Sequence, residues 1–212
     1  MTERRYPDSV YFRPWEGSNY PRGISGCKVL LVAESCYTWE DEDGRKKVPD
    51  TLHVPTMVQW HLDGNQMHIL SKIERTFLAA APSLSSTNDF WNSIALHEFV
   101  QRPMESRSHR PAAKDWRQSW VPFQAVARQL SPDCVFILGY EMWKNLRLEQ
   151  EKEVLVFAAE EELWRCGYSF ESTHTTPTFR IHHPSRAYQP DAWAPCVRKA
   201  LELATDRNRG AG

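Results

Sequence analysis

Four short apolar segments, each followed by a stretch with helical periodicity, constrain the fold of this chain more than any other feature. The segments lie at residues 27–35, 94–99, 134–138 and 178–182. Apolar runs of this length between turn-forming residues are typical of strands that are buried on both faces. Strands that alternate with helices favour a parallel sheet covered on both sides. We therefore predict an α/β fold, a three-layer α/β/α sandwich with a central, mostly parallel four-stranded sheet.

Helical periodicity fills the intervals between these segments. Residues 56–81 repeat apolar side chains at three- and four-residue spacing, and Gly64 predicts a break there. A second helix is predicted from Pro111 to about residue 130, bent at Pro122, and a third closes the chain. A length of 212 residues suits one core, so we predict a single domain over residues 1–212. We expect about 25 N-terminal and about 8 C-terminal residues to be peripheral to it.

Composition narrows the class of protein. No apolar run approaches the roughly 18 residues of a membrane helix, and the first residues lack the apolar core of a secretory signal. We expect a cytoplasmic monomer without membrane contact. The five cysteines form no CxxC pair, which predicts reduced thiols and neither zinc nor an iron–sulfur cluster. We predict no metal and no cofactor.

Polar residues follow each predicted strand. In parallel sheets, ligands bind beyond the carboxyl ends of the strands, where such residues meet. The rule selects residues 34–37, His97 and Glu98, residues 139–140, and residues 182–186. The candidate site is therefore predicted at this edge.

These residues carry a resemblance to a known family. "VLLVAESCYTWE" after the first strand and "HHPSR" after the last resemble the two signature loops of the uracil-DNA glycosylase superfamily, G-E-A-P-G and H-P-S. "FWNSIALHEFVQRP" and "SPDCVFILGYEMW" lie between them, in the order typical of an uncharacterised bacterial branch whose first motif reads G-E-S-H-Y. The resemblance spans about residues 28–190. It implies a monofunctional DNA glycosylase that flips an altered base out of DNA and hydrolyses its N-glycosidic bond, leaving an abasic site.

The chain departs from the family pattern at three positions. Ala33 stands where the family has glycine, and Cys36 stands where the branch has histidine. Glu98 falls near the position at which the family has an asparagine that helps to recognise the base. These differences bear on the substrate rather than the fold. Uracil, another modified pyrimidine and a hypermodified base of phage DNA all remain candidates, and so do roles in DNA repair and phage defence.

Glycosidic cleavage passes through an oxocarbenium-like sugar. The site needs a carboxylate near the sugar and a hydrogen-bond donor for the departing base. The resemblance assigns these roles to Glu34 and His183 respectively. The alternative for each is a structural one, a buried carboxylate paired with an arginine and a histidine that only supports the fold.

The base pocket is predicted at the ends of the first two strands. Tyr37 would stack on the flipped base or exclude bulky bases, unless it belongs to the core. The predicted pocket residues are Ala33, Ser35, Cys36, Tyr37, His97 and Glu98.

Base flipping also needs groups that fill the gap in the duplex and hold neighbouring phosphates. Pro184, Ser185, Arg186 and Tyr188 are the candidates on the last loop, with His182 expected to be structural. In the basic segment, residues 102–117, the predicted phosphate contacts are Arg107, Arg110 and Lys114. An ordinary solvated surface is the alternative for both.

Two other functions stay open. One is a nucleic-acid-binding module of the same fold without catalytic activity, which would need neither Glu34 nor His183. The other is a hydrolase that uses Cys36 as nucleophile with a histidine as base.

Overall fold

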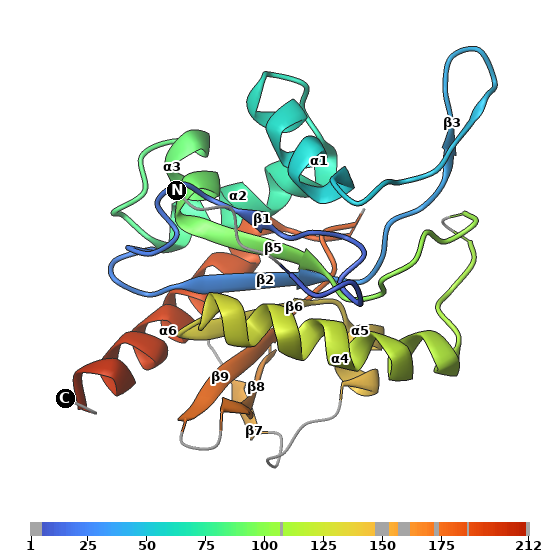
Figure 1. Ribbon diagram of the computed structural model, residues 1–212. Coiled ribbons are helices and arrows are strands. Elements are labelled where there is room, and N and C mark those ends of the chain that lie inside the picture. Colours follow the sequence, from blue (N-terminus) through green and yellow to red (C-terminus); the bar gives the residue numbers. More distant parts are fainter. Residues whose placement is uncertain are drawn as a thin grey trace.

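The structure is a computed structural model that describes residues 6–106, 108–146, 153–156, 162–171, 174–185 and 187–210. Figure 1 shows a central sheet with helices on both faces. In the part of the chain so described, no helix combines the length and the apolar character needed to cross a membrane.

Seven strands form the central sheet, in the order β1-β5-β2-β6-β9-β8-β7 (Figure 1). Its middle consists of four parallel strands, β5 (Ile94–Glu98), β2 (Val29–Ala33), β6 (Cys134–Leu138) and β9 (His174–Ile181). The side chains of β5 and β6 are buried throughout, as their continuous apolar runs predict. The four predicted strands are confirmed in position.

The prediction of a four-stranded, mostly parallel sheet is wrong, because three antiparallel strands extend it. β1 (Trp15–Glu16) pairs with β5 at one end. At the other end β8 (Glu162–Glu171) pairs with β9, and β7 (Glu153–Val156) pairs with β8. The sequences of these strands mix polar and apolar residues, so they lack the continuous apolar run that marks a fully buried strand. The sheet is therefore mixed.

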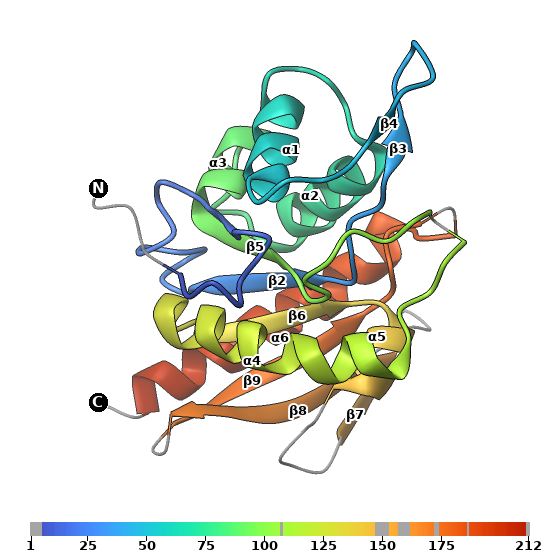
Figure 2. The same ribbon diagram turned by 45° about the vertical axis from the view of Figure 1, so that its right-hand side comes forward.

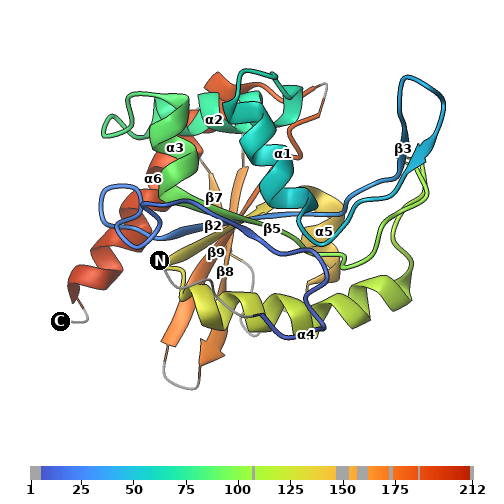
Figure 3. The ribbon, with the colours of Figure 1, turned by 45° about the horizontal axis from the view of Figure 1, so that its top comes forward.

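The two faces of the sheet are covered by different helices (Figures 2 and 3). One face packs against α1 (His53–Leu62), α2 (His68–Ala80), α3 (Thr87–Ser93) and α6 (Pro190–Gly210). The predicted break at Gly64 is confirmed, since α1 and α2 flank that residue and its φ is +98°.

The opposite face packs against α4 (Ala113–Leu130) and α5 (Tyr140–Asn145). Side chains of β2 alternate between the two layers. Leu31 joins the core under α2 and α6, whereas Leu30 and Val32 join the core under α4. The coarse prediction of an α/β sandwich is confirmed.

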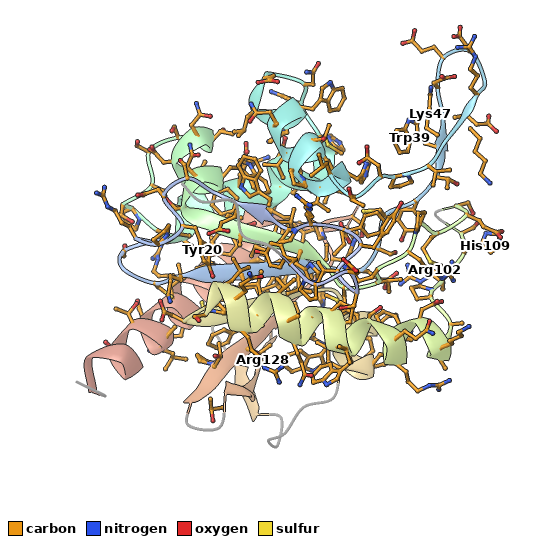
Figure 4. All side chains as sticks on the ribbon, in the orientation of Figure 1. Tyr20, Trp39, Lys47, Arg102, His109 and Arg128 are labelled. Carbon is orange, nitrogen blue, oxygen red and sulfur yellow. The ribbon has the colours of Figure 1, made fainter. Side chains whose placement is uncertain are left out.

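The N-terminal segment is not peripheral, contrary to the prediction. Phe12 and Tyr20 are 0% and 1% exposed, and β1 forms one edge of the sheet. Figure 4 labels Tyr20 close to the sheet. The sequence signal failed because charges and prolines dominate this stretch, although its few aromatic residues supply the buried contacts.

A hairpin of β3 (Trp39–Glu40) and β4 (Lys46–Lys47) projects away from the body of the molecule (Figure 1). It follows directly on the segment after β2. Trp39 is 46% exposed, and its ring lies 5.4 Å from that of His53.

Candidate functional site

The carboxyl ends of the parallel strands meet at one edge of the sheet. The register pairs Ala33 with Glu98, and Leu138 with Ile181. Beyond the strands, backbone hydrogen bonds still join residues 99–104 to residues 33–38. The polar residues that follow these strands are thereby held at the same edge.

Glu34 is the first residue after β2 and is 7% exposed. Its Oε2 accepts a hydrogen bond of 2.8 Å from the guanidinium group of Arg110. Its Oε1 is buried and has no hydrogen-bond partner among the described residues. Burial raises the pKa of Glu34 above its usual value of 4.5, and the positive charge of Arg110 opposes that rise. One carboxylate oxygen is thus fixed by an ion pair, and the other is buried without a hydrogen-bond partner among the described residues.

His183 follows β9 and lies against the turn after β6. A Cβ atom on Gly139 would lie 3.4 Å from the Cβ of His183, an ordinary van der Waals contact that shows how closely the two residues lie. The φ of Gly139 is +121°, a backbone conformation that favours glycine at this position. The surrounding protein and the charge of Arg110 both lower the pKa of His183, so its imidazole is neutral at neutral pH.

Arg110 has a different position from the one predicted. We expected it to contact phosphates, yet it pairs with Glu34 and lowers the pKa values of both predicted catalytic residues. Its side chain is 57% exposed, so it lies at the mouth of the site. In the sequence, Arg110 was distinguished only by its place in a basic segment. Because 76 residues separate it from Glu34, the local sequence gave no indication that the two would pair.

Glu98 and Cys36 form a second buried pair at this edge. The two groups lie close enough to shift each other's pKa, and Oε2 of Glu98 has no hydrogen-bond partner among the described residues. Burial, and then the charge of Glu34, raise the pKa of Glu98 to about 8. Burial and Glu98 also raise the pKa of Cys36 well above its usual value of 9.0. At neutral pH both groups therefore carry their protons.

The other predicted pocket residues divide into two groups. Ser35 is buried, and its hydroxyl group has no partner in the described part of the chain. Ala33 and Tyr37 are half-buried, each packed against a core cluster. Tyr37 also pairs with Met104 in a parallel bridge, which continues the pairing of β2 and β5.

His97 does not belong to a pocket at the edge, contrary to the prediction. It is 0% exposed, and its ring stacks on Phe123 of α4 at 6.3 Å. Burial lowers its pKa to about 3. Its place within β5 points the side chain into the layer under α4, as it does for Val32 in register on β2.

The loop after β9 is anchored to α2 rather than open on all sides. The ammonium group of Lys72 donates to the carbonyl oxygen of Ser185, and the hydroxyl groups of Thr76 and Tyr188 hydrogen-bond at 2.9 Å. Tyr188 is 4% exposed and stacks on Trp193.

Pro184, predicted to press on the DNA backbone, and Tyr188, predicted to fill the gap in the duplex or hold phosphates, are both buried in the free protein. Ser185 is exposed, and Arg186 lies outside the described residues. His182 is exposed, with its ring 4.9 Å from that of Trp193 of α6.

In the basic segment, Arg102 forms two hydrogen bonds with Asp115, and His109 lies 3.5 Å from Glu105 (Figure 4 labels Arg102 and His109). Lys114 is exposed, whereas Arg107 lies outside the described residues.

A surface cavity of about 380 Å³ lies between the hairpin and the basic segment, and none of the residues that line it is a predicted site residue. It is lined by Thr38, Trp39, Glu40, Lys46, Glu105 and Ser106. It begins one residue beyond Tyr37. Within the described residues, no group of three or more histidine, cysteine, aspartate or glutamate side chains is arranged to hold a metal ion.

Comparison with models of known protein families gave no match, and comparison with curated proteins gave none either.

Proposed function

We propose that this protein is a DNA glycosylase that hydrolyses the N-glycosidic bond of an altered, flipped-out pyrimidine. The observation that carries the proposal is the arrangement of Glu34 and His183 around Arg110. One oxygen of Glu34 is held by an ion pair while the other has no partner among the described residues, and the neutral imidazole of His183 follows β9, which is separated from β2 by β6.

Each group suits one half of the reaction. The free oxygen of Glu34 can position the attacking water or stabilise the positive charge that develops on the sugar. A neutral imidazole can donate its N–H to the base as negative charge builds up on it.

The structure bears differently on the two alternative functions, a Cys36 hydrolase and a nucleic-acid-binding module without catalysis. The Cys36 hydrolase is disfavoured, because the thiol is buried and its pKa is raised, so it has little thiolate character. A nucleic-acid-binding module without catalysis remains the second candidate. The ion pair between Arg110 and Glu34 favours it, since that pair occupies one carboxylate oxygen.

The test is release of a base from DNA. The protein would be incubated with single- and double-stranded oligonucleotides that each contain one altered pyrimidine, and abasic sites would be measured under single-turnover conditions. We expect Glu34→Gln and His183→Ala each to slow release about 10²-fold or more while retaining the folded state. The rate for His183→Ala should fall equally on paired and unpaired DNA, because its role follows flipping.

Two matched variants control for general effects. Glu141→Gln makes the same chemical change at an exposed glutamate that acts electrostatically on Glu34, and it should stay within about threefold of the wild-type rate. His182→Ala removes the neighbouring imidazole and should lower the melting temperature through its contact with Trp193. If no pyrimidine is released by the wild type but binding persists, the second candidate replaces the glycosylase.

A further inference from the structure

The loop that carries His183 is attached to α2 by side chains that the proposed reaction leaves without a role. Ser185 is exposed, yet its carbonyl oxygen accepts hydrogen bonds from the backbone N–H of Tyr188 and from the ammonium group of Lys72. Hydrogen bonds from a charged donor are the stronger kind. Because Lys72 and Ser185 are 113 residues apart, this contact fixes the loop to a distant element of the fold.

The attachment continues along the backbone to His183. The N–H group of Ser185 donates to the carbonyl oxygen of His183 at 2.6 Å, so the two residues form a tight turn. His183 also lies close to Gly139, in contact with the position that a Cβ atom on this glycine would occupy. A displacement of Ser185 would therefore also displace the backbone from which the imidazole projects.

A second contact holds the far end of the loop. Thr76 lies one helical turn after Lys72 on α2 and is 0% exposed. Its hydroxyl group donates its one proton to the carbonyl oxygen of Lys72 at 2.9 Å, so it accepts a hydrogen bond from the phenol group of Tyr188, also at 2.9 Å. Tyr188 in turn stacks on Trp193 of α6. Two neighbouring side chains of one helix thus fix the loop at two points.

We propose that Lys72 and Thr76 are positioning residues, which fix the loop after β9 and through it the imidazole of His183 before DNA binds. This inference rests on the proposed function for the reaction that His183 serves. Catalysis depends on such positioning, because a misplacement of about 1 Å can slow a reaction about 10²-fold.

The competing role for Lys72 is direct contact with a phosphate of DNA. Its ammonium group donates to a backbone carbonyl oxygen of the protein, which indicates the positioning role. The two roles have opposite consequences. A phosphate contact contributes to affinity and to the salt dependence of binding, whereas a positioning residue contributes to the rate of the bound complex.

Single-turnover base release at increasing protein concentration separates these roles. For Lys72→Met, we expect the maximal rate to fall about tenfold, while the protein concentration at half-maximal rate and its salt dependence stay within about twofold of the wild type. Lys72→Arg retains a cationic donor and should recover most of the rate. Arg75→Met removes an exposed cation from the same helix and should match the wild type. An unchanged maximal rate in Lys72→Met, or a loss confined to affinity and salt dependence, would overturn the assignment of Lys72.

A double-mutant cycle tests the contact between Thr76 and Tyr188. Thr76→Val removes the acceptor and Tyr188→Phe removes the donor of the same hydrogen bond. Each should lower the maximal rate, and the double variant should be no slower than Thr76→Val alone, because both changes break one interaction. Thr76→Ser keeps the hydroxyl group and should restore the rate. Losses that multiply in the double variant would show that this hydrogen bond does not position the loop.

The position of His183 can also be followed without catalysis, by NMR of isotope-labelled histidine rings. The signal of His183 is identified by its loss in His183→Ala. We expect it to shift or broaden in Lys72→Met and Thr76→Val, whereas the signal of His97, which is buried under α4, should stay in place.

This readout distinguishes failure of the inference from failure of the proposed function. If the wild type releases no base but the His183 signal responds to both substitutions on α2, the glycosylase proposal fails and the positioning of the loop stands. If bases are released but neither the maximal rate nor the His183 signal responds, only this inference fails. If no base is released and the signal does not respond, both fail.

Discussion

Arg110 is the residue on which the electrostatics of the site depend. Its guanidinium group hydrogen-bonds to Glu34, and its charge lowers the pKa values of Glu34 and His183 together. One cation thereby favours the ionised carboxylate and the neutral imidazole at the same time. These are the protonation states that the proposed chemistry needs.

Replacement of Arg110 with glutamine should shift the pH dependence of base release. Without the nearby charge, the pKa of Glu34 rises further above 4.5, so activity that needs the carboxylate is lost at a higher pH on the acid side. The measurement is the single-turnover rate from pH 4 to pH 8. Lys114→Gln removes an exposed positive charge from the same segment. In this variant the rate should fall on the acid side at the same pH as in the wild type. Coinciding profiles for Arg110→Gln and the wild type would show that Arg110 does not set the ionisation of Glu34.

At the scale of elements, the start of α4 holds the basic segment in position. The carboxylate of Asp115 accepts a hydrogen bond from the backbone N–H of Ala112 and two more from Arg102. The first turn of a helix leaves N–H groups unpaired, so a carboxylate here stabilises it. Because Arg110 lies two residues before Ala112, this contact also limits where the Arg110 side chain can reach.

Asp115→Ala should destabilise the protein by about 1 to 2 kcal/mol, since it removes the contact at the helix start and leaves Arg102 without its partner. Urea unfolding followed by circular dichroism measures this change. Arg117→Ala, two residues along the same helix on an exposed position, should change stability by less than about 0.5 kcal/mol. Equal effects of the two substitutions would mean that Asp115 does not stabilise the start of α4.

At the scale of the whole molecule, the central sheet buries two consecutive titratable residues, and burial shifts their pKa values in opposite directions. His97 and Glu98 are consecutive on β5, and both are buried. Burial holds the pKa of His97 at about 3 and that of Glu98 at about 8, against usual values of 6.5 and 4.5. Folding therefore takes up a proton at Glu98 between pH 4.5 and pH 8, and excludes one at His97 between pH 3 and pH 6.5.

The free energy of unfolding should consequently fall on both sides of an intermediate pH. From about pH 6.5 to pH 8 the unfolded state has lost the proton that folded Glu98 keeps, so stability declines as pH rises. Below pH 4.5 stability declines as pH falls, because unfolded His97 binds a proton that the folded state excludes. The slope for one proton is at most about 1.4 kcal/mol per pH unit.

Urea unfolding at a series of pH values checks this prediction. Glu98→Gln should remove the alkaline decline alone, and His97→Phe, which keeps a ring next to Phe123, should remove the acid decline alone. An alkaline decline in Glu98→Gln that matches the wild type would assign it to other groups.

The sequence by itself determined the central strands and most of the covering helices. Its apolar runs are continuous because the middle strands are buried on both faces. The helical periodicity is visible in the sequence because each helix buries only one face. The break near Gly64 followed from the same local signals. Placement of Glu34 and His183 at one edge also followed, since parallel strands bring their carboxyl ends together.

Only the tertiary structure decided which of those polar residues lie in the site. The pairing of Arg110 with Glu34 joins positions 76 residues apart, and no local pattern encodes such a contact. His97 and Tyr188 proved to be buried because the direction of a side chain depends on its strand register and on the helix packed above it. The antiparallel strands β1, β7 and β8 were set by pairing with distant segments, since their own sequences are too short or too mixed to specify a strand.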